Sequence, residues 1–212
     1  MNLILLGIFA YLLGSIPSAV IVGKVFYNID VRDYGSGNAG ATNTFRVLGV
    51  WPGIVVLILD MAKGCFAAGL VFLQIRYLPG YGYQWVNLKL IFGGLAVVGH
   101  LYPIFAGFRG GKGIATLLGM VIAIHYLSAL ACAGIFIAIL MGTRYVSLSS
   151  ILAAIAFPIL LALVFQKDNP YFIAFAIATA FLVVATHQKN IKRLLTRTES
   201  KANILPKHRT KK

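Results

Sequence analysis

Six long apolar stretches, separated by short polar stretches, dominate the pattern of the 212-residue chain. Each is close to the length of about 20 residues that an α-helix needs to cross a bilayer. They cover residues 3–23, 53–75, 88–106, 114–141, 148–165 and 171–186. The pattern therefore predicts an all-α fold, a polytopic integral membrane helix bundle.

The composition excludes a water-soluble globule. Hydrophobic residues make up 59% of the chain and charged residues 11%, whereas a soluble domain has roughly 25% charged residues. No basic segment precedes the first apolar stretch, so we interpret it as a retained span and not as a signal peptide. Cys65 and Cys132 both lie inside apolar stretches, a pattern that favours neither a metal site nor a disulfide framework.

Positive charge is concentrated at the C-terminal end. The chain has 19 lysines and arginines against 5 acidic residues, and nine of the basic residues lie in the last 25 positions, where Glu199 is the single acidic residue. A basic end on a membrane protein predicts a cytoplasmic segment that contacts anionic lipid. Nucleic acid is not an expected partner, because no aromatic residue is interleaved with these charges.

The basic polar stretches also predict an orientation. Residues 24–50, residues 107–113 and the C-terminal end carry positive charge and are expected on the cytoplasmic side. A single crossing by 114–141 would place the C-terminal end on the other side, whereas a turn near 125–128 makes this stretch cross twice and restores agreement. We expect about seven transmembrane helices, with the N-terminus outside and the C-terminus inside. The single crossing is the alternative.

A glycine-rich stretch at 35–43 is the first candidate for chemistry. Glycines let backbone amides turn towards a ligand, and successive amides form a nest that binds anions. The candidate groups are Ser36, Gly37, Asn38, Gly40, Thr42, Asn43 and the guanidinium of Arg46. The match to the dinucleotide pattern G-x-G-x-x-G is weak, because no strand precedes it. The composition favours phosphate binding over an ordinary flexible loop.

A second glycine-rich stretch, 107–113, runs directly into an apolar stretch. A glycine loop before a helix presents free amides and the positive end of the helix dipole to an anion. Gly110, Gly111 and the charge of Lys112 suit a phosphate group. The spacing departs from a Walker A loop and Gly113 replaces its magnesium-binding hydroxyl, so a nucleoside triphosphate is not implied. A tight basic turn is the alternative.

Two weaker signals lie near the last two apolar stretches. Ser147 and Ser150 are three positions apart and follow Arg144, and His187 and Asn190 have the same spacing where the last span ends. Side chains with this spacing share one face of a helix. Histidine is the usual proton carrier near neutral pH. The alternatives are serines that bond their own helix backbone and an interfacial histidine.

Charged residues also occur inside the apolar stretches. Asp60 and Lys63 lie three positions apart in the second stretch. Charges at such depth are costly and indicate either a functional group or an internal ion pair. His100, near the end of the third stretch, is either a proton carrier or an interfacial histidine, as for His187. The sequence leaves these interpretations open.

Three of these motifs, in this order, resemble those of a known family. GSGNAGATN at 35–43, GHLYP at 99–103 with GGKGIAT at 110–116, and RYVSLSSI at 144–151 closely resemble the cytoplasmic motifs of the bacterial acyl-phosphate:glycerol-3-phosphate acyltransferases, the PlsY family. The resemblance implies a seven-span enzyme of the bacterial inner membrane. Its reaction would transfer a fatty acyl group from acyl phosphate to the 1-hydroxyl of glycerol 3-phosphate, giving lysophosphatidic acid and phosphate, the first acylation of phospholipid synthesis.

The resemblance also assigns roles to single residues. Glycerol 3-phosphate would be recognised by Ser36, Arg46, Lys112, His187 and Asn190. The acyl-phosphate head would lie against Gly37, Asn38, Gly40 and Thr42, with Ser147 and Ser150 nearby, and the substrate-binding set is completed by Asn43, Gly110, Gly111 and Arg144. Catalysis is expected from His187, Asn190, Lys112 and Ser147. The base is either His187 or the phosphate of the acceptor itself.

Partners and surroundings follow from the same resemblance. The expected partners are glycerol 3-phosphate, acyl phosphate and membrane lipids, with no metal or other cofactor and with neither acyl-CoA nor acyl carrier protein as direct donor. Residues 1–195 would form the membrane-embedded acyltransferase domain, with its active site facing the cytoplasm, and residues 196–212 a basic cytoplasmic tail. A transporter of organic phosphates is the alternative, although the sequence lacks the internal repeats that transporters commonly have.

Overall fold

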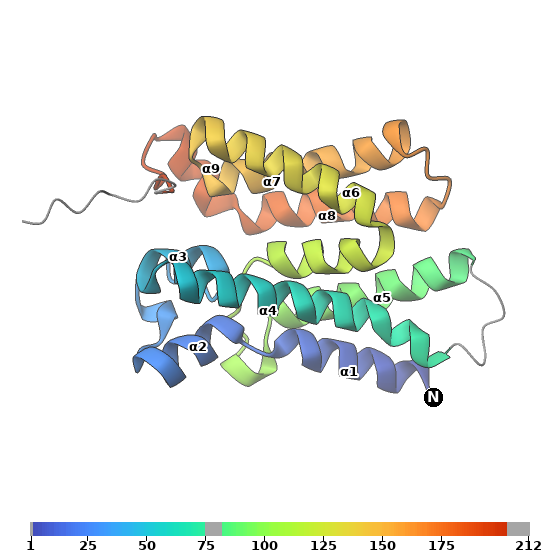
Figure 1. Ribbon diagram of the computed structural model, residues 1–212, viewed down its shortest axis with the longest axis horizontal. Coiled ribbons are helices and arrows are strands. Elements are labelled where there is room, and N and C mark those ends of the chain that lie inside the picture. Colours follow the sequence, from blue (N-terminus) through green and yellow to red (C-terminus); the bar gives the residue numbers. More distant parts are fainter. Residues whose placement is uncertain (1, 75–81, 203–212) are drawn as a thin grey trace, which may run out of the picture.

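The computed structural model describes residues 2–74 and 82–202, and its helices run along one long axis (Figure 1). Residue 75 of the second predicted span, much of the predicted 76–87 gap and the end of the predicted tail lie outside the described residues. The helices are α1 (Leu3–Ser15), α2 (Ser18–Tyr27), α3 (Ala41–Leu48), α4 (Val50–Gly69), α5 (Tyr83–Leu101), α6 (Ile114–Thr143), α7 (Val146–Ile159), α8 (Pro170–Thr186) and α9 (Gln188–Leu195). The predicted all-α fold class is confirmed.

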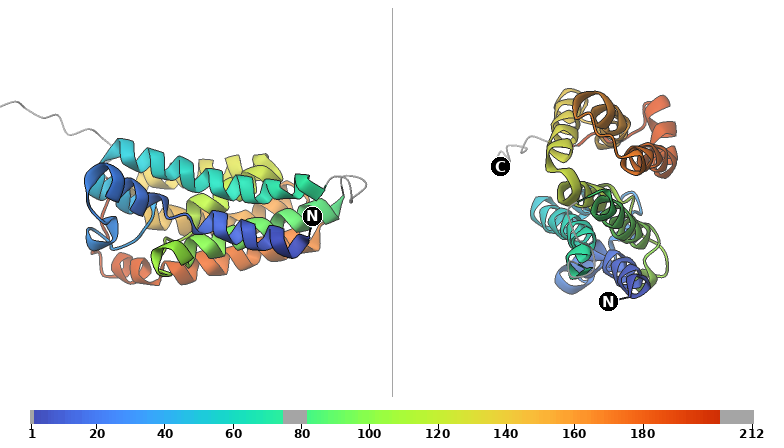
Figure 2. Two further views of the ribbon diagram at one scale, coloured as in Figure 1. Left: turned by 90° about the horizontal axis from the view of Figure 1, so that it is seen from below. Right: turned by 90° about the vertical axis from the view of Figure 1, so that its right-hand side faces the viewer.

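The helices form two groups that α6 joins. In the first group α1 packs along α5 and α4 contacts both, and in the second group α7 packs between α6 and α8 (Figures 1 and 2). Leu6 and Phe92 belong to the apolar core between α1 and α5, whereas Met120, Leu161 and Phe172 belong to the core of the second group. The second core extends across the junction, because it also includes apolar residues of α5.

Glycines bring α4 and α6 into backbone contact. A Cβ atom on Gly64 would collide with the carbonyl oxygen of Thr116, and one on Gly119 would collide with the carbonyl oxygen of Met61. Small residues at such positions allow helices to pack closely inside a membrane, where burial of apolar surface alone gives no preference for protein over lipid. The contact holds the start of α6 firmly against α4.

The first predicted span is bent. Residues 3–23 form α1 and the larger part of α2, whose axes differ by 42° at Ile16 and Pro17. Proline has no amide hydrogen to donate to the preceding turn, so the helix is interrupted there. The carbonyl oxygen of Ile16 instead accepts a hydrogen bond from Lys63 Nζ at 3.1 Å.

The chain reverses direction within α6, at the predicted turn. The backbone angles of His125, φ −152° and ψ 88°, lie outside the helical region, and the two halves of the element run in opposite directions (Figure 1). His125 Nδ1 accepts the Ser128 N–H at 3.2 Å and so caps the second half. Lys89 Nζ donates to the carbonyl oxygen of Ala123 at 2.8 Å and caps the first half.

Large apolar side chains face outwards along the bundle, while polar groups lie inside it. Exposed examples on six helices are Phe9, Ile58, Ile91, Leu130, Ile155 and Phe181. Among the described residues, four helices are long and apolar enough to cross a membrane, or up to six if each of two bent helix pairs counts as one span. This surface suits lipid and not water.

Candidate active site

The carboxamide of Asn43 organises the first glycine-rich stretch. Asn43 lies in α3 with 1% of its surface exposed, and its Nδ2 donates to the carbonyl oxygens of Val31 at 2.7 Å and Tyr34 at 3.1 Å. Its Oδ1 accepts the Ser36 N–H at 2.8 Å and the Ser36 hydroxyl at 3.1 Å. Asn43 therefore shapes the loop, and its polar atoms already have partners within the protein.

Fewer backbone amides of the first glycine-rich stretch are available to an anion than the sequence suggests. The Gly37 N–H donates to the carbonyl oxygen of Tyr34 at 3.1 Å, so it does not face outwards. The eight-residue helix α3 begins at Ala41 after Gly40, and no side chain in the described structure caps this end. The amides around Gly40, Ala41 and the exposed Thr42 are thus the ones suited to an anion.

Arg32 joins the two glycine-rich stretches. Its Nε and Nη2 lie 3.0 and 2.8 Å from the two carboxylate oxygens of Asp30, and its Nη1 donates to the carbonyl oxygen of Ala106 at 2.8 Å. The guanidinium holds the pKa of the Asp30 carboxyl well below its usual range, chiefly through the side-chain hydrogen bond. Sequence reasoning missed Arg32, and the Asp-x-Arg spacing is the signal that pointed to it.

Gly110 and Gly111 let the second glycine-rich stretch pack against the end of α5. The Gly111 N–H donates to the carbonyl oxygen of His100 at 3.1 Å. A Cβ atom on Gly110 would collide with that same oxygen, and one on Gly111 would collide with the His100 imidazole. The two glycines therefore set the position of Lys112, the next residue of the loop.

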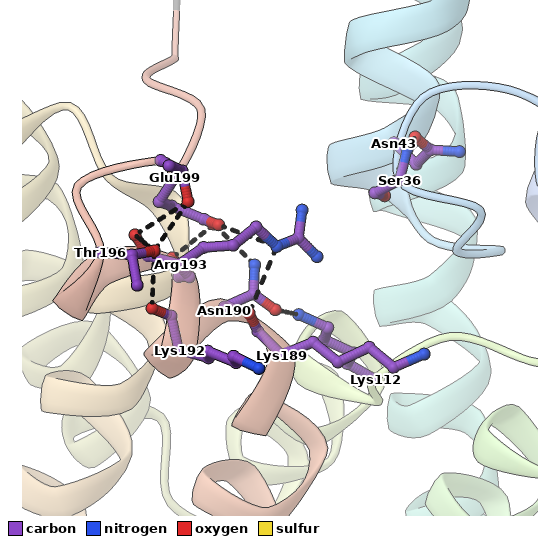
Figure 3. Close-up of polar contacts among 11 residues, drawn as sticks. Ser36, Asn43, Lys112, Lys189, Asn190, Lys192, Arg193, Thr196 and Glu199 are labelled. Carbon is purple, nitrogen blue, oxygen red and sulfur yellow. Dashed lines mark hydrogen bonds and ion pairs between the residues drawn. The ribbon is translucent and has the colours of Figure 1, made fainter.

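Lys112 begins a chain of polar contacts that joins segments far apart in the sequence (Figure 3). Lys112 Nζ donates to Asn190 Oδ1 in α9. Asn190 Nδ2 donates to Glu199 Oε1 at 2.6 Å, and the hydroxyl of Ser147 in α7 donates to the same oxygen at 2.8 Å. Arg193 Nε lies 3.7 Å from Glu199 Oε2. We call Lys112, Ser147, Asn190, Arg193 and Glu199 the lysine cluster.

Glu199 is a site residue that sequence reasoning missed, because it lies in the segment predicted to be a basic tail. Its side chain is only 6% exposed, and the Ala202 N–H donates to the carbonyl oxygen of Arg144 at 2.7 Å. Residues 196–202 thus pack back onto the bundle. The single acidic residue among nine basic ones was the available signal.

The two ends of the double-length α6 meet at this cluster. Lys112 lies two residues before the first residue of the helix. Arg144 directly follows the helix, and its carbonyl oxygen accepts the hydrogen bond from the segment that carries Glu199. Because the helix reverses at His125, both ends lie at the same end of the bundle (Figure 1). A straight helix of 30 residues would separate them by about 45 Å.

The cluster carries unbalanced positive charge. Burial lowers the pKa of Lys112 to about 8; the Glu199 carboxylate opposes this shift, and the guanidiniums of Arg193 and Arg46 add to it. Arg46 is therefore close enough to act on the same space as Lys112. Three cations with one carboxylate make this end of the molecule suited to an anion.

His187 is a neutral imidazole within electrostatic range of Lys112. It is 3% exposed, and burial, together with the charge of Lys112, lowers its pKa to about 4. Its Nδ1 lies 2.8 Å from the carbonyl oxygen of Val183, and since a carbonyl only accepts, Nδ1 carries the proton. The other nitrogen, Nε2, keeps its lone pair and can accept a proton.

The predicted site residues are brought together only in part. Lys112, Ser147 and Asn190 are in one hydrogen-bonded chain, and Ser36 lies across from Lys112 in the close-up (Figure 3). The hydroxyl of Ser150, by contrast, donates to the carbonyl oxygen of Val146 in its own helix at 2.9 Å, the alternative considered from the sequence.

The remaining groups suit phosphate binding and proton transfer. A buried ammonium, guanidiniums and helix-end amides bind phosphate, and a neutral imidazole can take a proton from a hydroxyl. Among the described residues, no group of three histidine, cysteine or acidic side chains is placed to hold a metal ion.

Comparisons with known proteins agree on one family. The family model described as glycerol-3-phosphate acyltransferase matches residues 4–197. A glycerol-3-phosphate acyltransferase of Bacillus cytotoxicus is 44% identical over 206 residues, which span 97% of this chain and 98% of the relative. One of Chlorobaculum parvum is 42% identical over 215 residues, spanning 91% and 93%.

Two solved structures have the same fold. The glycerol 3-phosphate form of PlsY (YgiH), an integral membrane glycerol 3-phosphate acyltransferase, superposes with a TM-score of 0.84 at 38% identity, over 95% of this chain and 96% of that one. Its lysophosphatidic acid form superposes with a TM-score of 0.80 at 38% identity, over 94% of each chain.

Proposed function

Because the chain belongs to the glycerol-3-phosphate acyltransferase family, we propose that it transfers a fatty acyl group from acyl phosphate to the 1-hydroxyl of sn-glycerol 3-phosphate. The bond between acyl carbon and phosphate oxygen breaks, an ester bond forms, and lysophosphatidic acid and inorganic phosphate are released. The observation that carries this proposal is the lysine cluster, in which an excess of cations lies beside a neutral histidine. Family membership argues against the transporter alternative.

The acceptor phosphate binds at Lys112. This role is supported by the ammonium's half-buried position and by the nearby charge of Arg46. Asn190 accepts from Lys112 and is itself held by Glu199, so the ammonium is oriented before substrate arrives. Ser36 lies across from Lys112 (Figure 3), and its hydroxyl would donate to the phosphate in place of Asn43 Oδ1 when substrate binds. Preorganised donors of this kind stabilise charge without reorganisation during the reaction.

The acceptor hydroxyl loses its proton to one of two bases. His187 Nε2 is free to accept it, because Nδ1 is engaged with the carbonyl oxygen of Val183. The phosphate of the acceptor itself is the second candidate. We test this choice with His187→Ala: near-normal kcat at saturating acceptor assigns the proton to the substrate, and a large loss of kcat assigns it to the histidine.

The donor's phosphate binds at the start of α3, around Gly40 and Thr42. The uncapped amides of this helix end suit a phosphate group. An acyl phosphate is already activated, so no enzyme nucleophile is required, and the protein mainly positions the two substrates. We accordingly propose no cofactor, and neither acyl-CoA nor acyl carrier protein as direct donor.

We further propose seven spans, with the lysine cluster on the cytoplasmic side of a bacterial inner membrane. Up to six spans are counted when each bent pair is one span and α6 is counted once, and the reversal at His125 adds the seventh. The basic residues near Lys112 support the orientation, since positive charge is enriched on the cytoplasmic side. Cysteine labelling of Ser36→Cys and Lys112→Cys in intact cells tests it, because both must react only with reagents that cross the membrane.

The function is tested with purified protein, radiolabelled glycerol 3-phosphate and palmitoyl phosphate. Formation of a lipid-soluble product that co-migrates with lysophosphatidic acid is the expected result. A parallel incubation with palmitoyl-CoA identifies the donor, and product from that donor alone would contradict the proposed reaction. Uptake of label into proteoliposomes without product would support transport.

A further inference from the structure

Three ionisable side chains lie buried together between α4 and α5, away from the lysine cluster. Asp60, Lys63 and His100 are 2%, 5% and 5% exposed. Lys63 Nζ lies 2.9 Å from Asp60 Oδ1, and His100 Nδ1 lies 3.7 Å from the same oxygen. Burying such groups carries a desolvation penalty that packing alone does not explain. We call these three residues the aspartate cluster.

The aspartate cluster contacts two places where the helices are interrupted. Lys63 Nζ donates to the carbonyl oxygen of Ile16 at the bend between α1 and α2. His100 contacts Gly111 twice, since its carbonyl oxygen accepts the Gly111 N–H and its imidazole lies where a Cβ on Gly111 would be.

Both glycine-rich stretches meet this cluster. Ala39 of the first stretch and Gly110 and Gly111 of the second line one narrow crevice together with Lys63 and His100. Ala39 is itself buried, with 5% of its surface exposed. The aspartate cluster therefore lies directly beneath the loops that carry the proposed substrate contacts.

We propose that Asp60, Lys63 and His100 are positioning residues for acyl transfer. Asp60 orients the His100 imidazole, His100 holds Gly111, and Gly111 places Lys112 where its ammonium meets the acceptor phosphate. None of the three touches substrate. This inference rests on the proposed function, since it assigns the phosphate of glycerol 3-phosphate to Lys112.

The charges of the cluster indicate a geometric role. The Lys63 ammonium has the Asp60 carboxylate and the Ile16 carbonyl as partners, and the carboxylate has Lys63 and His100. The charges of Asp60 and Lys63 balance each other, so this ion pair leaves no net charge for a ligand. The cluster acts on the site by fixing the position of the loop 107–113. A small displacement of a binding group in that loop is enough to weaken a substrate complex.

Steady-state kinetics of His100→Ala and Asp60→Asn test the proposal. We expect each to raise the KM for glycerol 3-phosphate by about tenfold, with kcat within about threefold of the original value, because the loop moves while the chemistry is kept. Phe92→Ala is the matched control: Phe92 is 1% exposed in the core between α1 and α5, and that core cluster contains no residue of either glycine-rich stretch. It lowers the thermal unfolding midpoint in detergent and leaves KM unchanged.

A double variant separates positioning from charge compensation. Asp60→Asn with Lys63→Gln removes both charges, so we expect the unfolding midpoint to recover while KM stays raised, since His100 has lost its carboxylate. Recovery of both the unfolding midpoint and the KM in the double variant would overturn the proposal. It would also be overturned if His100→Ala had a lowered unfolding midpoint but the same KM as the unaltered protein. His100→Asn, which keeps a donor facing Asp60, gives the same KM comparison if His100→Ala does not fold.

Failure of the proposed function is recognised separately. If the unaltered protein forms no product, the reaction assignment is wrong. The positioning role of the aspartate cluster is then tested by phosphate binding without an activity assay. Inorganic phosphate then raises the unfolding midpoint of the unaltered protein and of Phe92→Ala but not of His100→Ala. An equal rise in all three proteins would refute the positioning role.

Discussion

The two buried polar clusters of this protein are built in opposite ways. In the aspartate cluster, the lysine and the carboxylate are partners within 2.9 Å, and the surrounding groups complete the set. In the lysine cluster, Lys112 and Arg193 share one carboxylate, that of Glu199, and the guanidinium of Arg46 adds positive charge that acts on Lys112. Charge that the protein does not balance suits an anionic substrate, whereas we assign to the balanced charge a role in holding the backbone in place.

The clusters also differ in how far their members lie apart in the sequence. Lys112, Ser147 and Glu199 come from the loop before α6, from α7 and from the segment after α9. Asp60 and Lys63 are one helical turn apart, and His100 comes from the next long helix. The lysine cluster forms only when the second helix group has packed, so it depends on the whole fold.

Lys112→Ala gives the largest expected effect. Loss of the ammonium removes stabilisation of phosphate charge, and kcat/KM for glycerol 3-phosphate falls by about a hundredfold to a thousandfold, comparable to loss of an oxyanion-hole donor. The unfolding midpoint changes little, because loss of the hydrogen bond to Asn190 is offset by removal of a partly buried charge that the protein does not balance. Lys192→Ala, an exposed lysine on α9, is the control and keeps kcat/KM within about twofold. Equal activity of the two variants would contradict the interpretation that the unbalanced charge of the lysine cluster binds substrate.

Glu199→Ala comes next and affects both activity and stability. The variant leaves Asn190 and Ser147 without their shared acceptor, and we expect a loss of about 2 kcal/mol in stability, typical of removing one partner of a buried charged hydrogen bond. Glu199→Gln keeps one oxygen acceptor and is expected to lose less of both. Activity assays and thermal unfolding in detergent check this, and an unchanged midpoint in Glu199→Ala would show that the segment after α9 does not contribute.

The pH profile gives a smaller effect. In the proposed reaction Lys112 binds phosphate as the ammonium. Because its pKa is lowered to about 8, the charged fraction falls as the pH rises through that value. The kcat/KM for glycerol 3-phosphate should therefore decline by about tenfold per pH unit above pH 8. His187, with a pKa of about 4, stays neutral over the range from pH 5 to 8. Lys112→Arg, whose guanidinium stays charged, should lose this decline, and a decline that persists in that variant would place the titrating group elsewhere.

The smallest expected effect lies outside both clusters. Gly134 is an exposed residue of α6 with open space around a Cβ, so Gly134→Ala should stabilise the protein by about 0.5–1 kcal/mol without a change in KM. Gly119→Ala, whose Cβ would collide with the Met61 carbonyl, should shift stability in the opposite direction. A changed KM in Gly134→Ala would mean that KM follows the overall stability of the protein and not the position of a binding group.

Much of the fold was predictable because the apolar stretches are long and the charges are asymmetric. The turn at His125 followed from charge placement, and the structure shows its cause in the caps at His125 and Lys89. The helix α3 and the bend at Pro17 were missed. The short helix α3 mixes polar and apolar residues and begins inside the glycine-rich stretch, and it packs against α4.

Site residues that lie in the sequence motifs were predictable, whereas those whose place depends on tertiary packing were not. Lys112, Asn190 and Ser147 were identified from the motif resemblance and are joined in the structure through Glu199. Glu199 itself depends on the chain folding back after α9, which no local pattern reveals. Ser150 shows the reverse case, since the spacing was right but the hydroxyl is used by its own helix.

The position of Glu199 after α9 has a consequence for the order of assembly. The described helices α1 to α9 all precede this residue in the sequence, so translation makes them before it makes the shared acceptor for Asn190 and Ser147. The carboxylate is thus added to a set of helices that has already been synthesised, and the polar contacts of the lysine cluster are closed from the C-terminal side.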